Sequence, residues 1–175
     1  IESQYAYKDI ELIENGVITI SRNGQVVRYD LDGNIVWENT EKEYWYSSVT
    51  SVDDGIIAVS QSGKVVKYDL DGNIVWEKTE KRYGYTDITS VDDGVIAVSG
   101  YYSAIKGQVV KYDLNGNIVW ENTEKEYNYE SVTSVEDGII AVSGKGQVVK
   151  YDLDGNIVWE NTEKEYMCES VTTVD

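Results

Sequence analysis

The chain has 175 residues and a formal net charge of −17, from 32 acidic and 15 basic side chains. So acidic a chain repels phosphate backbones, and its longest apolar runs, such as Ile56 to Val59, fall far short of the ~20 residues that cross a bilayer. The sequence therefore predicts neither nucleic-acid binding nor a membrane span. It contains no histidine and a single cysteine, Cys168, which excludes an internal disulfide framework and a zinc site built from several cysteines.

A repeat of 39 residues runs through the chain. Four tryptophans end the segment Gly-Asn-Ile-Val-Trp, at Trp37, Trp76, Trp120 and Trp159, and their spacings are 39, 44 and 39 residues. The longer third unit carries an insertion around Tyr101 to Lys106. Because the copies are nearly identical, we interpret them as a recent duplication or a designed array.

One unit, residues 44–82, predicts four short strands in chain order. Ser48 to Val52 is a β-branched run that ends at an acidic turn, and Ile56 to Ser60 is continuously apolar, as in a buried strand. Lys64 to Leu70 alternates between apolar and charged residues. Asp71-Gly72 then marks a hairpin before the strand from Asn73 to Glu77. Four short strands in about 40 residues are typical of one blade of a β-propeller.

The segment Tyr-Asp-Leu-Asp-Gly-Asn-Ile-Val-Trp, at 29–37, 68–76 and 151–159, resembles the PQQ-like (quinoprotein-type) propeller repeat. The copy at 112–120 has Asn115 in place of the second Asp. The resemblance implies an all-β propeller of four-stranded antiparallel blades. It also implies that Trp37, Trp76, Trp120 and Trp159 pack between neighbouring blades. Quinoprotein enzymes of the family need a different set of residues in each blade to hold quinone and calcium, so near-identical blades predict no cofactor and no enzyme.

The repeat divides one propeller domain, residues 1–175, into four units and an extra copy of the first strand. The units lie at about 5–43, 44–82, 83–126 and 127–165, and the extra strand at 166–175. Four blades of this type suggest half of an eight-bladed ring, closed by a second copy in a homodimer. Since the chain opens with Ile1 and not Met, we expect a mature or trimmed form, or a piece of a longer array.

Two acidic motifs have both a structural and a chemical interpretation. The Asp-Leu-Asp-Gly-Asn loops contain oxygen ligands that could suit calcium, but they lack most of a twelve-residue calcium loop, so we interpret them as hairpin turns. The acidic pairs at Asp53-Asp54, Asp92-Asp93 and Glu136-Asp137 could serve glycoside hydrolysis. Their repetition in successive blades argues against a single catalytic pair. We predict no catalytic residue and no metal site.

The copies differ chiefly at two positions near the start of each first strand. The first reads Ala6, Trp45, Gly84, Asn128 and Met167; the second reads Lys8, Ser47, Thr86, Glu130 and Glu169. Loops at a propeller rim vary over a rigid scaffold, so we predict a binding rim there. The candidate residues are Tyr44, Trp45, Tyr46, Ser47, Tyr83, Gly84, Tyr85, Thr86, Tyr127, Asn128, Tyr129, Glu130 and Met167, with Tyr101 and Tyr102 of the insertion. The alternative is that the tyrosines pack between blades.

These features favour a non-enzymatic scaffold that binds a protein through the variable rim. The alternatives are a lectin-like propeller that binds carbohydrate, and a duplicated or designed repeat without a specific ligand. A fragment of a quinoprotein dehydrogenase fits the sequence least. The composition suits a secreted, surface or cytoplasmic location equally well.

Overall fold

The computed structural model describes residues 6–40, 44–100, 107–163 and 169–172. This part of the chain forms four four-stranded antiparallel sheets, each made of four consecutive strands. The blades are β1 (Tyr7–Ile13), β2 (Gly16–Ser21), β3 (Val26–Tyr29) and β4 (Ile35–Asn39); β5 (Tyr46–Val52), β6 (Gly55–Ser60), β7 (Lys64–Asp69) and β8 (Ile74–Thr79); β9 (Tyr85–Val91), β10 (Gly94–Ser99), β11 (Val109–Asp113) and β12 (Ile118–Asn122); and β13 (Tyr129–Val135), β14 (Gly138–Ser143), β15 (Val148–Tyr151) and β16 (Ile157–Asn161). In the described residues there is no helix of the length and hydropathy that a membrane span requires.

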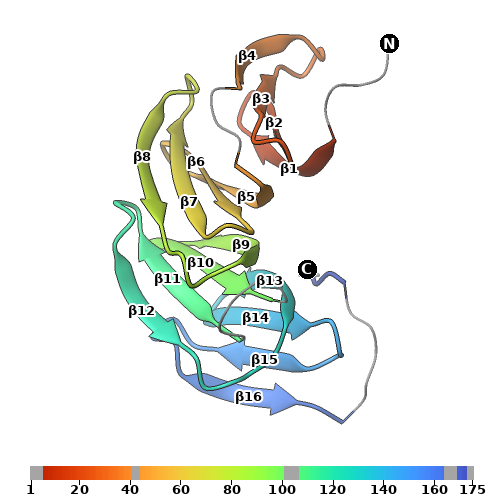
Figure 1. Ribbon diagram of the computed structural model, residues 1–175, viewed down its shortest axis with the longest axis vertical. Helices are drawn as coiled ribbons and strands as arrows, with labels where there is room; N and C mark the ends of the chain where they lie inside the picture. The colour runs from red at the N-terminus through yellow and green to blue at the C-terminus, as the bar shows by residue number, and fades with distance from the viewer. Residues whose placement is uncertain (1–5, 41–43, 101–106, 164–168, 173–175) are drawn as a thin grey trace.

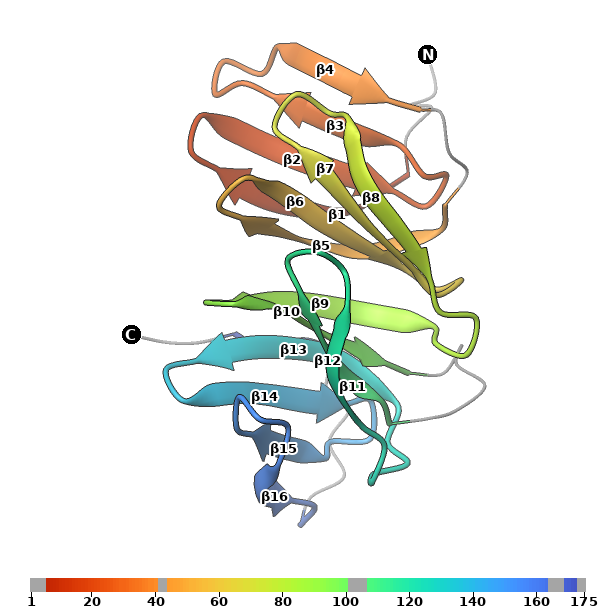
Figure 2. The same ribbon diagram turned by 90° about the vertical axis from the view of Figure 1, so that its left-hand side faces the viewer.

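The four blades fan out in chain order along an arc, with β1, β5, β9 and β13 on its concave side (Figure 1). The view from the side shows the same succession from the first blade to the fourth (Figure 2). The predicted all-β propeller of four-stranded blades is confirmed.

The sequence predicts an extra first strand at 166–175. Its described part, residues 169–172, is not in a strand. Each of β1, β5, β9 and β13 is held by the second strand of its own blade. Residues 169–172 have no such second strand among the described residues.

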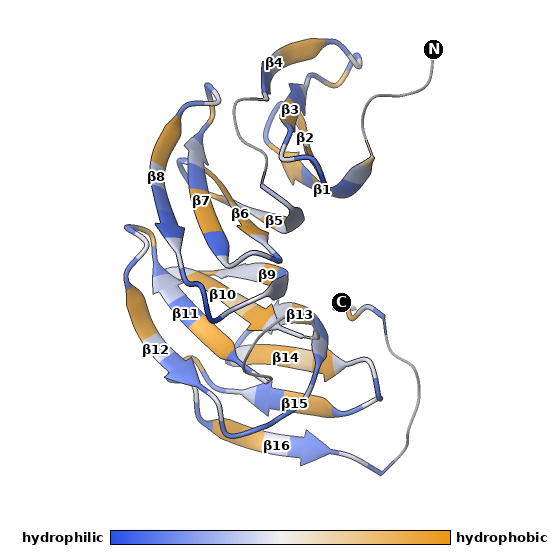
Figure 3. Ribbon diagram, viewed as in Figure 1, coloured by the Kyte–Doolittle hydropathy of each residue, from blue (hydrophilic) through white to orange (hydrophobic). Residues whose placement is uncertain are grey.

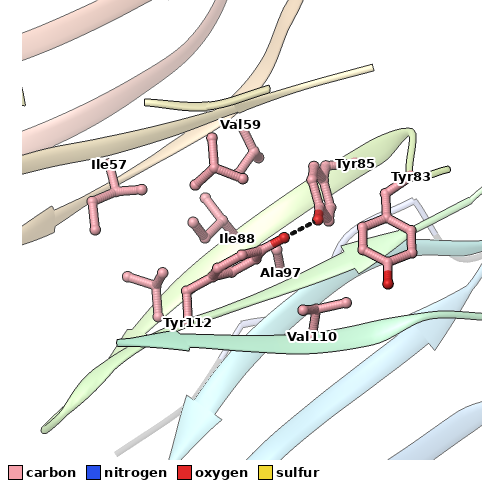
Figure 4. Packing of buried hydrophobic residues seen from close by; sticks show 10 residues of the cluster. Ile57, Val59, Tyr83, Tyr85, Ile88, Ala97, Val110 and Tyr112 are labelled. Carbon is pink, nitrogen blue, oxygen red and sulfur yellow. Dashed lines mark hydrogen bonds between the residues drawn. The ribbon is translucent and has the colours of Figure 1, made fainter. Parts of the chain in front are cut away.

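The hydrophobic core lies between consecutive blades. Hydrophobic segments run through the middle strands β6, β10 and β14 (Figure 3). Between the second and third blades, Ile57 and Val59 of β6 pack against Tyr85, Ile88 and Tyr112 of the next blade (Figure 4). Equivalent clusters join the first blade to the second and the third to the fourth. The second and third blades therefore each contribute their two faces to two different cores, and the stability of a blade depends on its neighbours.

One tryptophan of each of the first three blades crosses to the next blade. The indole nitrogens of Trp37, Trp76 and Trp120 donate hydrogen bonds to the carbonyl oxygens of Leu70, Leu114 and Leu153, at 2.8, 2.9 and 2.8 Å. Trp159 of the fourth blade is 42% exposed, and no blade follows it among the described residues, so the packing between blades expected for Trp159 is not seen.

Two separate constraints require a glycine in the hairpin that follows each of these leucines: the backbone conformation and the close approach of the tryptophan ring. Gly72 has a φ of +85°, which favours glycine, and a Cβ atom there would lie 2.7 Å from the ring of Trp37. Gly116 and Gly155 stand in the same relation to Trp76 and Trp120. In the first blade a Cβ on Gly33 would meet nothing within 4 Å, because no preceding blade lies there among the described residues.

Trp76→Ala tests the contact between blades. The indole is half-buried and hydrogen-bonded, so its loss should reduce the free energy of unfolding by about 3 kcal/mol, near the lower end of the range for removing a buried tryptophan. Trp45→Ala is the control, since Trp45 is 65% exposed and its loss should cost about 0.5 kcal/mol or less. Equal losses in urea unfolding would show that the indole does not hold the blades together.

Candidate functional site

The two variable positions lie at one edge of the blades, where the strands of the concave side begin. The backbone carbonyls at the first position accept hydrogen bonds from amides in the turn between the second and third strands of the same blade. These pairs are Ala6 with Arg22, Trp45 with Gln61, and Asn128 with Gly144, at 3.1–3.3 Å. We call this edge, formed by positions 6, 45, 84 and 128 with the turns at 22–25, 61–63 and 144–147, the variable rim.

Trp45 is the large exposed side chain at the first variable position. It is 65% exposed, whereas Gly84 is buried and Asn128 is half-buried. The side-chain oxygen of Asn128 is buried and has no hydrogen-bond partner in the part of the chain that the structure describes. Ala6 is exposed but small. Among the described residues at the first variable position, Trp45 is therefore the one large exposed aromatic side chain.

The expected aromatic surface of tyrosines is wrong for four of its members. Tyr46, Tyr83, Tyr85 and Tyr129 are buried in the cores between blades, so the alternative, in which the tyrosines pack between blades, describes them. The reason is pairing: the hydroxyls of Tyr46 and Tyr129 share hydrogen bonds of 2.6 and 2.7 Å with third-strand tyrosines, and Tyr85 has an equivalent partner. Those partners are Tyr68, Tyr151 and Tyr112.

Tyr44 and Tyr127 are half-buried, and each donates its hydroxyl to a glutamate of the fourth strand. The Tyr44 hydroxyl lies 2.5 Å from Oε2 of Glu77, and Lys64, which forms an ion pair with Glu77, lies 4.8 Å from the centre of the Tyr44 ring. Tyr127 bonds Glu160, which also pairs with Lys125. The hydrogen bond to Glu160 raises the pKa of Tyr127. These hydrogen bonds fix the two tyrosines beside Trp45 and Asn128 of the variable rim.

At the second variable position, two residues link neighbouring blades. The hydroxyls of Ser47 and Thr86 donate to the backbone carbonyls of Tyr85 and Tyr129 in the next blade, both at 2.7 Å. Glu130 is half-buried without such a bond, and burial raises the pKa of its carboxyl group. Ser47 and Thr86 therefore act in packing and are poorly placed to contact a ligand.

Three candidate residues fall outside the described part of the chain. They are Met167, Tyr101 and Tyr102.

The acidic motifs lie on the opposite rim and are bonded within the protein. The second acidic residue of each of these turns is an aspartate that pairs with a mostly buried lysine. The pairs are Lys67–Asp54, Lys111–Asp93 and Lys150–Asp137, at 2.8, 2.7 and 2.6 Å. In the first hairpin loop, the Asp30 carboxylate accepts bonds from the Asn34 side chain and from backbone amides, which lower the pKa of Asp30. Within the described residues, no three potential ligand side chains gather in a group that could hold a metal.

A ladder of polar side chains that was not predicted from the sequence runs along the concave side. The Ser48 hydroxyl lies 2.9 Å from Oδ2 of Asp9 in the preceding blade and 2.7 Å from Oδ1 of Asp87 in the next. Ser131 donates to Oδ2 of Asp87 at 2.7 Å. The signal is visible in the sequence, because equivalent positions of the four units alternate between Asp and Ser.

The buried tyrosines predict a sharp alkaline transition. Burial raises the pKa of Tyr46, Tyr85 and Tyr129 above the ordinary value of 10.0, and that of Tyr151 to about 12. Folding therefore favours their neutral forms, a stabilisation that is complete below pH 10 and is lost as the pH rises further. Tyrosinate absorbance should rise together with loss of the β-sheet circular dichroism. Ionisation of all tyrosines near their ordinary pKa, with the sheet signal unchanged, would contradict this account.

Comparison with known proteins places the chain in a family. Residues 22–162 match the PQQ-like family model described as outer membrane protein assembly factor BamB. No curated protein matches the chain. Among solved structures it is similar to the computationally designed Ika4 protein, with a TM-score of 0.73 and 13% identity over 85% of this chain and 92% of that one, a likeness of fold. Because the family match extends over most of the sequence, the chain belongs to the PQQ-like repeat family of BamB.

Proposed function

We propose that this chain is a non-enzymatic binding scaffold that holds a protein partner on the variable rim, with Trp45 as the central contact. The observation that carries the proposal is the exposure of Trp45, at 65%, at a position where the other described blades have Ala6, Gly84 and Asn128. Tryptophan is enriched among the residues that dominate binding at protein interfaces. A large indole left in water at a variable position is therefore the natural contact for a partner.

The surroundings of Trp45 support a preformed contact. Its backbone carbonyl is held by the amide of Gln61, and its neighbour Tyr44 is tied to Glu77. The rings of Tyr44 and Tyr46 meet edge to face, 5.7 Å apart. A contact that is already ordered loses less conformational entropy when a partner binds.

A single exposed aromatic residue at the first variable position favours a protein over a carbohydrate. A lectin-like propeller with one pocket in each blade would need the aromatic residue to recur around the rim, and Gly84 and Asn128 stand at its place in later blades. The family relationship agrees with a scaffold only in the sense that the matching model is named for an assembly factor.

Trp45→Ala tests the rim. A displayed peptide library selected on the wild-type chain should yield ligands whose affinity falls roughly tenfold or more with Trp45→Ala, about 1.4 kcal/mol. Val75→Ala, which shortens another exposed side chain on the outer strand β8, is the matched control and should leave affinity unchanged.

A glycan array run in parallel separates the two kinds of ligand. The proposal predicts no glycan binding that depends on Trp45. Glycan binding lost in Trp45→Ala, or peptide ligands that bind this variant as well as the wild type, would overturn it.

A further inference from the structure

Every junction between two blades of this chain joins the same two surfaces. The indole face of the preceding blade carries, in the first blade, Ile18, Ile20, Val26 and Trp37. The hairpin face of the following blade carries, in the second blade, Tyr46, Val49, Tyr68 and the Leu70–Gly72 turn. The chain repeats this junction three times, with clusters of matching composition.

The hairpin face of the first blade is uncovered. Ile10 is 61% exposed, whereas its equivalent in the second blade, Val49, is 4% exposed. Leu31 is 75% exposed, and Gly33, the equivalent of Gly72, has open space where a Cβ atom would point. This face thus has the same residue types as the other hairpin faces, and no described residue of another blade packs against it.

The described residues leave the indole face of the fourth blade largely uncovered as well. Trp159 is 42% exposed, and Ile140 and Val148 are half-buried where the equivalent Ile18 and Val26 are fully buried. One chain therefore carries both halves of a junction that it already forms internally, one at each end of its arc (Figure 1).

We propose that two copies of this chain associate head to tail, with the indole face of each fourth blade covered by the hairpin face of the other copy's first blade. Trp159 would donate to the carbonyl of Leu31 and lie over Gly33 of the second copy, as Trp37 does with Leu70 and Gly72. Two such junctions satisfy both ends of both copies and give a closed ring of eight blades.

The polar ladder fits this junction. Oδ1 of Asp87 accepts two hydrogen bonds, from its neighbour Ile88 and from Ser48 of the preceding blade. Oδ1 of Asp9 accepts the equivalent bond from Ile10, at 2.9 Å. Ser131 of a second copy would lie against Asp9 as Ser48 lies against Asp87, with its single hydroxyl proton shared between Asp9 and Asp87 of its own chain. The fourth blade has a serine at this position, so the alternation continues only if the next blade has an aspartate there. The first blade has one, Asp9.

The charges at the second variable position also fit. The two inner blades have hydroxyl residues there, whereas the end blades have opposite charges, Lys8 in the first and Glu130 in the fourth. A head-to-tail junction places these charges in neighbouring blades. Burial raises the pKa of Glu130 and the charge of Lys8 in the same chain lowers it, so these two positions already attract each other, and Lys8 of a second copy in the neighbouring blade would add to that attraction.

Residues 169–172 of the same chain lie beside Ser131 of the fourth blade, where the proposal puts the β1 strand of a second copy, and they fit there less well. The amide of Val171 lies 3.4 Å from the Ser131 hydroxyl, as the amides of Val49 and Val132 lie near Asp9 and Asp87. This segment brings Ser170 where the alternation requires an aspartate. It also brings Glu169 toward Glu130, and that like charge raises the pKa of Glu130 further. We therefore expect the β1 strand of a second copy to displace it.

Solution mass tests the proposal. Light scattering after size exclusion should give twice the 19.8 kDa chain mass. Association should strengthen with salt, because each copy carries a net charge of −17. Ile10→Asp should lower the association constant roughly a hundredfold, since it places a charge in a core that the internal junctions keep dry. Val75→Asp is the matched control, because Val75 is 53% exposed on the outer strand β8 and should leave the mass unchanged.

A mixing experiment distinguishes head-to-tail contact from contact between two like faces. Ile10→Asp and Trp159→Ala should each be single chains alone and form a dimer when mixed, because the mixed pair regains one intact junction. Charge exchange adds a second readout: Lys8→Glu should weaken the dimer, and Lys8→Glu with Glu130→Lys should restore it. A single chain at all concentrations, an open-ended polymer, or no recovery on mixing would overturn the proposal.

Discussion

The structure depends on the contact between an indole and the hairpin of the following blade. A four-stranded sheet that is apolar on both faces cannot be stable alone, so each blade needs a neighbour on each side. The indole sets the spacing and orientation of that neighbour, because its nitrogen reaches one carbonyl and its ring covers one glycine, as Trp76 does with Leu114 and Gly116. Since the contact is directional, every junction has an indole side and a hairpin side.

The near-identity of the units hides a second level of order. On the concave side, Asp and Ser alternate, so that each serine hydroxyl bridges or joins carboxylates of its neighbours. Half-buried carboxylates such as those of Asp9 and Asp87 gain from such donors, because their desolvation is otherwise costly. The repeating unit of this array is thus a pair of blades, and four blades contain two such pairs. Trp45 takes no part in the Asp–Ser alternation. We assign it to binding because it is exposed at a position that varies between blades.

The sequence could predict the fold well because side-chain alternation and turn residues act locally. The strands expected at 48–52 and 56–60 correspond to β5 and β6 to within two residues. The tyrosines were harder to place. Whether Tyr46 faces solvent or a neighbour depends on Tyr68 lying opposite, and that pairing follows from the register of three strands and the approach of another blade. Trp45 and Tyr46 are adjacent in sequence, yet one is exposed and the other is buried. Nothing in the residue types of Trp45 and Tyr46 indicates which of the two is buried.

Hydrogen exchange at the five indole nitrogens tests the central contact most directly. In dilute solution, where the chain is a single copy, the account predicts slow exchange at Trp37, Trp76 and Trp120 and fast exchange at Trp45 and Trp159. Raising the concentration should slow Trp159 alone. Exchange at Trp37, Trp76 and Trp120 as fast as at Trp45 would contradict the account, because the indoles could not then be holding successive blades together.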